Sequence, residues 1–190
     1  MKKIIIGILG FKQSGKDTIG NFLVEKYNFR KTAFAHNLKK AVSIIFDIPE
    51  ELCFGSEEDK NQLTRVKWSD LQDIEYKDPK IDLQFLSVRE VLKLFATEVC
   101  RAKIPDIWTK FINLSGDRVV VTDVRFPNEV ELIKNNGGVL LEVTRPGTAA
   151  SNHASEKKLS DNLIDYSIAN DGTIEELYLK VISTIEKIID

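Results

Sequence analysis

The sequence predicts an α/β fold in which five parallel strands form one sheet with helices on both of its faces. Three observations support this prediction. Largely apolar runs, typical of buried strands, occur at 4–9, 119–122 and 139–144. Segments with apolar residues at helical spacing alternate with these runs, which implies right-handed crossovers between parallel strands. A loop bounded by two glycines also joins the first strand directly to a helical pattern.

That loop is the most informative stretch of the chain. Its spacing is Gly-x-x-x-x-Gly-Lys, and its residues are Gly10, Lys12, Ser14, Gly15, Lys16, Asp17 and Thr18 with Phe11 and Gln13 between them. Glycines adopt positive φ at little cost, so successive N–H groups can face one anion at a positive helix N-terminus. The lysine can then reach the outer phosphates of a nucleotide. A turn that merely starts a helix is the alternative, but the strand before and the helix after favour a P-loop.

One position departs from the usual P-loop pattern. The hydroxyl residue that should follow Lys16 and meet Mg²⁺ is Asp17, and Thr18 comes one position later. The metal ligand at this point is therefore open between Asp17, Thr18 and water.

The next part of the chain is less regular. A short strand is expected at 29–35, followed by a helix at 37–46 that ends before Pro49. Residues 47–82 are rich in charge, have weak periodicity, and form too long a stretch for an ordinary structureless loop. We expect an excursion from the main sheet that is partly helical.

A capping box, Ser87 to Glu90, starts the next predicted helix. Four residues recur at every fourth position of this helix and would form one stripe: Arg89, Lys93, Thr97 and Arg101. A solvated face is the ordinary reading of such a stripe. An anion site is the alternative, and the residues leave the two readings about even.

The strand at 119–122 ends in Thr122 and Asp123, after a short predicted helix at 106–114 that carries Trp108. Ligands of open parallel sheets bind at the carboxyl ends of strands, and an acidic residue there can hold Mg²⁺. Asp123 could instead cap the next helix, but Pro127 is better placed as its first residue. We therefore assign Asp123 to the site, and Arg125 from the same edge could meet a phosphate.

The rest of the chain completes the alternation. A helix at 130–136 stops at a glycine pair, and the strand at 139–144 leads into Arg145. The small polar residues of 148–161 have the composition of a loop or lid, in which His153 is better read as structural than as catalytic. A final strand at 165–169 and a second capping box lead into an amphipathic C-terminal helix.

Composition excludes several functional classes. A net charge of −2 and a pI near 5.8 show no electrostatic footprint for nucleic acid or anionic membranes. No apolar run approaches a membrane span, and the short run at the start lacks a signal-peptide cleavage site. The two cysteines have no metal-ligand spacing. We expect free thiols and a cytoplasmic location.

Taken together, the motifs resemble one family, the deoxynucleoside monophosphate kinases of bacteriophages, which are P-loop enzymes related in fold to adenylate and thymidylate kinases. The resemblance covers most of the chain outside 47–82. It rests on the loop with its Lys-Asp-Thr ending and on these further motifs: Ser87-Val-Arg89-Glu, Ala96-Thr97-Glu98-Val-Cys-Arg101, Ile107-Trp108, Thr122-Asp123-Val-Arg125-Phe-Pro-Asn128-Glu129, Gly137-Gly138-Val139, Arg145-Pro146, His153-Ala-Ser-Glu156 and Asn170-Asp-Gly172. Asp17 is usual in this family, whereas Ala96 replaces a more common glycine.

The resemblance implies a P-loop NTPase fold with three α-β-α layers, in one kinase domain spanning 1–190. A substrate-binding excursion would occupy about 47–86 and a lid about 145–161. The activity would be transfer of the γ-phosphoryl group of ATP, with Mg²⁺, to a (deoxy)nucleoside monophosphate.

Particular residues take roles under this resemblance. ATP would be held by the loop, by Asn170 and by Gly172, and Mg²⁺ by Asp17 or Thr18 with Asp123. Catalysis would use Lys16, Asp123, Arg125 and Arg145. The monophosphate and its base would be met by Arg89, Arg101, Glu98, Trp68 and Trp108, although core packing is at least as good a reading for Trp108.

Other functions remain open at this point. A P-loop kinase of another metabolite, such as phosphomevalonate or dephospho-coenzyme A, would use the same basic residues. A nucleotide-binding module without catalysis is a further alternative, while a GTP switch lacks its Asn-Lys-x-Asp motif here. The expected partners are ATP and a nucleoside monophosphate, with no nucleic acid and no membrane. Accepted bases, ribose preference and oligomeric state, including a homodimer, are left open.

Overall fold

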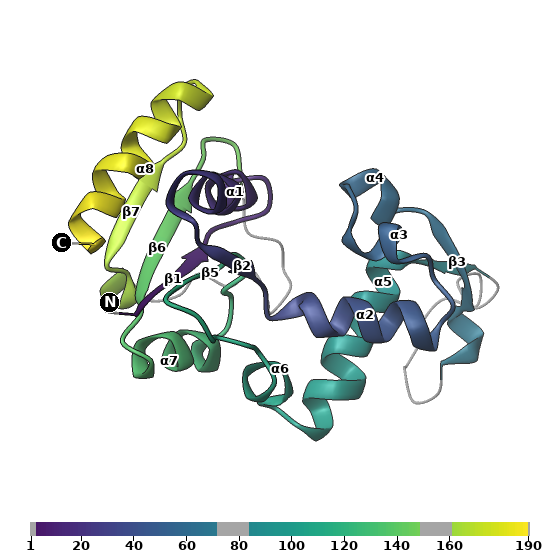
Figure 1. Ribbon diagram of the computed structural model, residues 1–190. Coiled ribbons are helices and arrows are strands. Elements are labelled where there is room, and N and C mark those ends of the chain that lie inside the picture. The colour runs from purple at the N-terminus through teal and green to yellow at the C-terminus, as the bar shows by residue number, and fades with distance from the viewer. Residues whose placement is uncertain (1–2, 72–83, 149–160, 190) are drawn as a thin grey trace. The chain divides into compact units, whose positions relative to one another are not determined.

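The structure is a computed structural model of the 190-residue chain and describes residues 3–71, 84–148 and 161–189 (Figure 1). The chain divides into two compact units. Unit 1 combines Met1–Phe34 with Ile112–Asp190, and unit 2 is the intervening segment Ala35–Phe111. Unit 2 is therefore an insertion in the sequence of unit 1.

Unit 1 contains the predicted parallel sheet. Its five strands lie in the order β2-β5-β1-β6-β7, and every neighbouring pair is parallel. The strands are β1 (Ile4–Leu9), β2 (Arg30–Thr32), β5 (Arg118–Val121), β6 (Val139–Thr144) and β7 (Tyr166–Ala169). The central strand β1 is almost wholly buried, as its unbroken apolar sequence predicts. The predicted fold class is confirmed.

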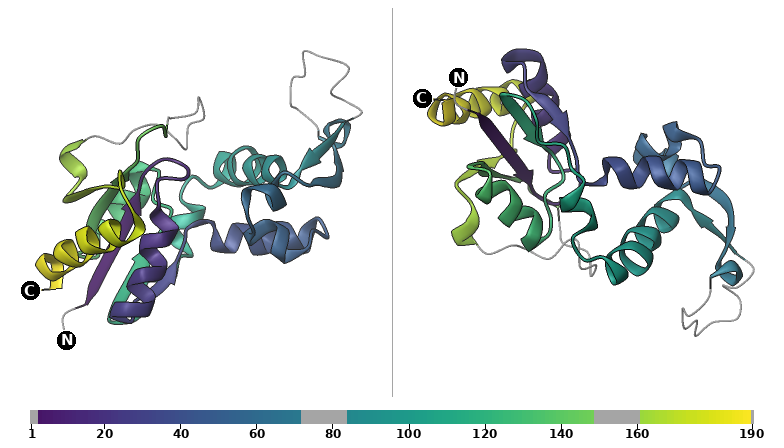
Figure 2. Two further views of the ribbon diagram at one scale, coloured as in Figure 1. Left: turned by 90° about the horizontal axis from the view of Figure 1, so that it is seen from above. Right: turned by 60° about the horizontal axis from the view of Figure 1, so that its bottom comes forward.

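Helices cover both faces of this sheet (Figures 1 and 2). Helices α1 (Lys16–Tyr27) and α8 (Ile174–Ile189) lie on one face, where their apolar residues join Ile6 and Ile8 of β1 in one core. Helix α7 (Pro127–Asn135) packs on the opposite face. A Cβ at Gly7 would lie 3.3 Å from Ile133 of α7, so the bare glycine lets this helix approach the central strand.

The connections after β1 and β5 leave the sheet toward opposite faces. These strands are neighbours, but β1 leads into α1 on one face and β5 leads toward α7 on the other. Such a divergence is a topological switch point, where ligands of open α/β sheets bind. The glycine loop follows β1, and Asp123 follows β5.

Unit 2 is mainly helical. Its elements are α2 (Ala35–Ile45), α3 (Glu50–Phe54), α4 (Glu57–Lys60), β3 (Leu63–Lys67), the 3₁₀ turn η1 (Trp68–Asp70), β4 (Phe85–Ser87), α5 (Val88–Leu94), the π-helix η2 (Phe95–Arg101) and α6 (Ile107–Lys110). The range 35–111 is wider than the excursion expected at 47–86. Strands β3 and β4 pair antiparallel, a second sheet that the sequence analysis did not predict. Residues 72–83 of the expected excursion lie outside the described residues.

The helix predicted from the Ser87 capping box changes character halfway. It is α-helical only to Leu94 and continues as a π-helix to Arg101. The hydroxyl of Thr97 donates to the carbonyl of Lys93 at 2.8 Å, which competes with the normal ladder of the helix. The prediction of one regular α-helix, with a straight stripe from Arg89 to Arg101, was therefore wrong beyond Leu94.

Two further properties bear on the expectations from composition. Cys53 is buried, Cys100 is half-buried, and both are free thiols. In the part of the chain that the structure describes, no helix has the length and apolar content needed to cross a membrane.

Candidate phosphate-binding site

The glycine loop lies between the end of β1 and the start of α1, as predicted. Three of its residues have positive φ: Gly10 at 144°, Gln13 at 62° and Gly15 at 108°. A Cβ at Gly10 would overlap the carbonyl oxygen of Val143 on the neighbouring strand β6, so the loop can begin there only with glycine. Positive-φ residues allow a loop to turn successive N–H groups toward one anion, although the N–H of Ser14 donates to the carbonyl of Phe11 at 3.2 Å.

Lys16 is the first residue of α1 and is only 8% exposed. Its ammonium group donates to the carbonyl of Gly10 at 2.7 Å and to that of Phe11 at 2.6 Å. The charge is thus held over the loop itself rather than in solvent. A buried ammonium at a helix N-terminus concentrates positive charge at one place, and that place is the predicted phosphate site.

The glycine loop also forms a hydrogen bond with the chain that follows the edge strand β7. The side-chain amide of Asn170, which follows β7, donates to the carbonyl of Ser14 at 2.9 Å. A Cβ at Gly15 would lie 2.6 Å from the same amide nitrogen. Ser14 is fully buried, and its hydroxyl has no hydrogen-bond partner among the described residues. Asn170 therefore positions the loop, a role that is visible only in the folded chain.

Arg145 follows β6 and reaches the same loop. Its Nη1 lies 3.4 Å from the carbonyl oxygen of Gln13, while most of the side chain stays exposed. The structure thus brings the guanidinium group of Arg145 to the loop. The lid predicted at 145–161 is only partly described, and His153 and Glu156 lie outside the described residues.

The chain after β5 is shaped by a residue that the sequence analysis did not single out. Glu129 is 2% exposed, and its carboxylate accepts the N–H groups of Arg125 at 2.7 Å and Phe126 at 3.0 Å. Phe126 is the N-cap of α7 and Pro127 its first residue, as predicted. An N-terminal box that starts on Phe126 rather than on a hydroxyl residue gives no ordinary sequence signal.

Asp123 is not the N-cap of α7, which is Phe126. It is half-buried, and its Oδ1 accepts the N–H of Phe34 at 2.7 Å. This bond links the chain after β5 to the chain after β2 within unit 1. The exposed side chain of Arg125 follows at the same sheet edge.

Asp17 and Thr18, the predicted magnesium ligands at the loop, lie in the first turn of α1. Asp17 in the first turn of α1 forms an ion pair with Lys31 of β2, with its Oδ1 2.8 Å from Nζ. Thr18 follows it in the helix. Among the described residues, no three acidic, histidine or cysteine side chains gather to hold a metal. Magnesium normally takes only one or two carboxylates from the protein, with phosphates and water supplying the rest, so a three-residue cluster is not required for this ion.

The predicted acceptor residues belong to unit 2. Arg89 pairs with Glu57 at 2.6 Å, and Nη1 of Arg101 lies 3.5 Å from the carbonyl of Pro105. Trp108 is 9% exposed, which agrees with core packing, and its indole N–H has no partner among the described residues. Trp68 is half-buried and Glu98 is exposed.

Lys12 and Gly172 are the other two residues predicted to contact ATP. Lys12 is exposed on the loop. A Cβ at Gly172 would overlap the carboxylate of Glu176, which accepts the N–H of Thr173 at 2.8 Å in the predicted capping box of α8. The glycine thus allows this helix start, whatever else it contacts.

A buried strand that runs through a glycine loop into a helix, beside a strand that ends in an aspartate, defines the P-loop class of phosphate-binding proteins. Comparison with known proteins narrows this class. The profile of the family described as deoxynucleotide monophosphate kinase matches residues 3–103 and 50–181. The chain belongs to the deoxynucleotide monophosphate kinase family.

Individual relatives agree with this assignment. A protein of Acanthamoeba polyphaga mimivirus, provisionally described as a deoxynucleotide monophosphate kinase, is 31% identical over 96% of both chains. The deoxynucleoside-5'-monophosphate kinase of Escherichia phage T5 is 26% identical over 94% of both chains. Similar solved structures include shikimate kinase from Aquifex aeolicus, with 14% identity, 96% coverage of both chains and a TM-score of 0.47. Another is dephospho-CoA kinase from Campylobacter jejuni, with 14% identity, 99% and 98% coverage and a TM-score of 0.48.

Proposed function

We propose that this chain transfers the γ-phosphoryl group of ATP to a deoxynucleoside or nucleoside monophosphate and releases the two diphosphates. The observation that carries the proposal is the buried ammonium of Lys16 over a loop with three positive-φ residues, at the switch point of a parallel sheet. Family membership supports the choice of acceptor, because relatives from mimivirus and phage T5 carry that activity in their names.

The donor half of the reaction is assigned to unit 1. The loop at residues 10–16 would bind the β- and γ-phosphates, with Lys16 supplying a point charge to the outer phosphates. Phosphoryl transfer needs in-line positioning and stabilisation of charge on the transferred group more than covalent help. The contact of Arg145 with the loop supports a role in neutralising that charge. Asn170 and Gly172 follow β7 and would lie near the adenine.

The acceptor half is assigned to arginines with planar, bidentate donor groups. Arg89, Arg101 and Arg125 would each bind the monophosphate or the phosphoryl group in transfer. Trp68 and Trp108 are the candidates for stacking on the base, and Glu98 lies between the two arginines of unit 2 in sequence. The phosphate oxygens of the acceptor are already nucleophilic, so no general base is required, and Asp123 would orient the acceptor.

Magnesium would be held by Asp17 or Thr18 together with Asp123. When bound, the ion neutralises phosphate charge on the nucleotide. Cys53 and Cys100 are free thiols, which fits a reducing compartment, so we place the reaction in the cytoplasm.

A coupled assay of ADP release tests the proposal across all ribo- and deoxynucleoside monophosphates, with ATP and magnesium. Turnover is expected with at least one deoxynucleoside monophosphate and loss of it in Lys16→Ala. Preference for phosphomevalonate or dephospho-coenzyme A would replace the acceptor assignment. A wild-type chain that binds ATP but transfers phosphate to no acceptor would instead be a binding module.

A further inference from the structure

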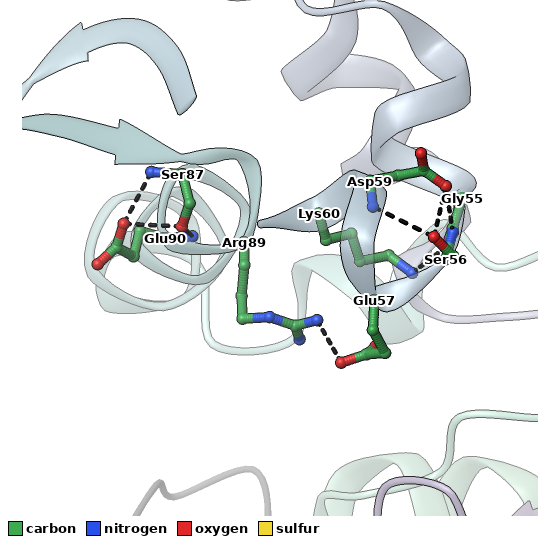
Figure 3. Close-up of polar contacts among 8 residues, drawn as sticks. All are labelled: Gly55, Ser56, Glu57, Asp59, Lys60, Ser87, Arg89 and Glu90. Carbon is green, nitrogen blue, oxygen red and sulfur yellow. Dashed lines mark hydrogen bonds and ion pairs between the residues drawn. The ribbon is translucent and has the colours of Figure 1, made fainter. Parts of the chain in front are cut away.

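A pair of short helices in unit 2 holds a carboxylate against the first of the acceptor arginines. Glu57 is the first residue of α4 and Arg89 is the second of α5, and the two side chains extend toward each other (Figure 3). Nη2 of Arg89 lies 2.6 Å from Oε2 of Glu57. The residues are 32 positions apart in sequence, so only the fold brings them together.

The start of α4 is tightly constrained. The carboxylate of Asp59 accepts both the N–H and the hydroxyl of Ser56 at 2.7 Å, and the Ser56 hydroxyl accepts the N–H of Asp59 at 3.2 Å. A Cβ at Gly55 would lie 2.5 Å from the carbonyl oxygen of Glu51 and would overlap the Asp59 carboxylate. Lys60 donates to the carbonyl of Gly55. A four-residue helix is marginal alone, so these bonds fix the direction of Glu57.

The start of α5 is fixed in the same way. Ser87 donates its N–H and its hydroxyl to the carboxylate of Glu90 at 2.7 Å, and its hydroxyl accepts the N–H of Glu90 at 3.3 Å (Figure 3). Arg89 lies between the two members of this box. Glu57 and Arg89 therefore both project from backbone that the hydrogen bonds of a capping box hold in place.

This pair is poorly suited to a purely stabilising role. The side chains of Arg89 and Glu57 are 37% and 40% exposed, and ion pairs in such surroundings contribute little to stability. The contact uses one terminal nitrogen of a guanidinium group that carries five N–H donors in a plane. A phosphate can therefore be bound by other donors of the same group while the contact with Glu57 persists.

We propose that Glu57 is a positioning residue that orients the guanidinium of Arg89 for the phosphate of the acceptor. The inference rests on the proposed function, because it takes Arg89 as a ligand of the monophosphate. A long arginine side chain loses rotamer freedom on binding, and a carboxylate that already holds it reduces that cost. Glu57 would thus act on acceptor binding without touching substrate or ATP.

Steady-state kinetics with the best deoxynucleoside monophosphate from the acceptor assay test this role. Glu57→Ala is expected to raise the KM for the monophosphate about 10-fold, with the KM for ATP unchanged, because misaligned groups lose about this much or more. Glu57→Gln keeps an acceptor oxygen and should restore most of the loss. Glu58→Ala, an exposed carboxylate on the same helix, is the matched control and should behave as wild type.

A double variant separates positioning from a general structural effect. In an Arg89→Ala background, Glu57→Ala should change the KM for the monophosphate by less than about twofold, because it acts through the arginine. Additive effects, an unchanged KM or a lower KM in Glu57→Ala would each overturn the inference. So would an Arg89→Ala variant with a normal KM. Failure of wild type to phosphorylate any monophosphate would overturn the proposed function as well, which tells the two failures apart.

Discussion

The amide of Asn170 donates to the carbonyl of Ser14 at 2.9 Å and so ties the end of β7 to the glycine loop. Asn170→Ala is expected to raise the KM for ATP roughly 3- to 10-fold, the cost of one hydrogen bond that orders the loop. The KM for the monophosphate should not change. Ser167→Ala, an exposed position on the same strand, serves as control. Equal loss for both substrates would show that the bond supports the fold rather than the loop.

Lys16 should govern turnover more than stability. Lys16→Met keeps most of the aliphatic stem but removes the ammonium that contacts Gly10 and Phe11. The rate of diphosphate formation is expected to fall about 10³-fold, as when a preorganised charge is removed from a developing negative charge. Circular dichroism should be unchanged. Lys26→Met, in the last turn of the same helix, is the control, and a comparable loss there would disconnect the effect from the loop.

A substitution at Asp17, which forms an ion pair with Lys31, tests where magnesium binds. Asp17→Asn is expected to raise the Mg²⁺ concentration for half-maximal rate by roughly 10-fold if Asp17 lies near the ion. Calorimetry of ATP binding with and without magnesium gives a readout independent of turnover. Glu25→Gln on the exposed part of the same helix should leave both unchanged. An unaltered titration in Asp17→Asn would move the role to Thr18 or Asp123.

The close approach of α1 to β5 depends on Gly20. A Cβ there would lie 2.5 Å from the methyl carbon of Thr122. Overpacking costs about 1–3 kcal/mol, while helix propensity returns about 1 kcal/mol, so Gly20→Ala should lower the free energy of unfolding. Urea denaturation measures the change. Thr122→Ser removes the methyl and should reverse the sign of the effect in the double variant; persistence of the loss would place the strain elsewhere.

Asp59 provides a pH prediction. The hydroxyl and the backbone N–H of Ser56 donate to its carboxylate and hold its pKa below the usual value for aspartate. A group whose pKa is lowered by folding stabilises the protein above its unfolded-state pKa, and that contribution is lost as the pH falls through the folded-state pKa. An NMR titration of the Asp59 carboxyl carbon should show a raised pKa in Ser56→Ala. Ser69→Ala should leave it unchanged, and no rise in Ser56→Ala would refute the cause.

The main sheet could be predicted because its strands carry their own signal. Residues 4–9 form an apolar run, and 139–144 are mostly apolar with Glu142 as the one charged residue, as expected of strands that are largely buried. Strand β3 has no such signal: Leu63 is 69% exposed, and the strand exists through its ladder with Phe85–Ser87. The π-helix is equally hidden, because the apolar spacing of 88–99 is the same as that of an ordinary α-helix.

Some residues of the candidate site could be predicted from a local motif, whereas others are connected only by contacts between distant parts of the chain. Residues 10–18 form a contiguous motif whose chemistry follows from spacing alone. By contrast, the bond from Asn170 to Ser14 joins positions 156 residues apart, and Glu57 meets Arg89 only after α4 and α5 have packed. Sequence patterns carry no record of such pairs, so residues that position others are found only in the structure.

The interruption of unit 1 has a consequence for how the chain acquires its structure during synthesis. Strand β2 pairs with β5, but all of unit 2 separates them in sequence. During synthesis on the ribosome, β2 therefore has no strand to pair with until unit 2 and then β5 have emerged. Arg30 of β2 donates to the carbonyls of Asn113 and Ser115, and these bonds can form only after unit 2 has been synthesised. Unit 2 can form its own contacts meanwhile, whereas the sheet of unit 1 is complete only after β5, β6 and β7 have been synthesised.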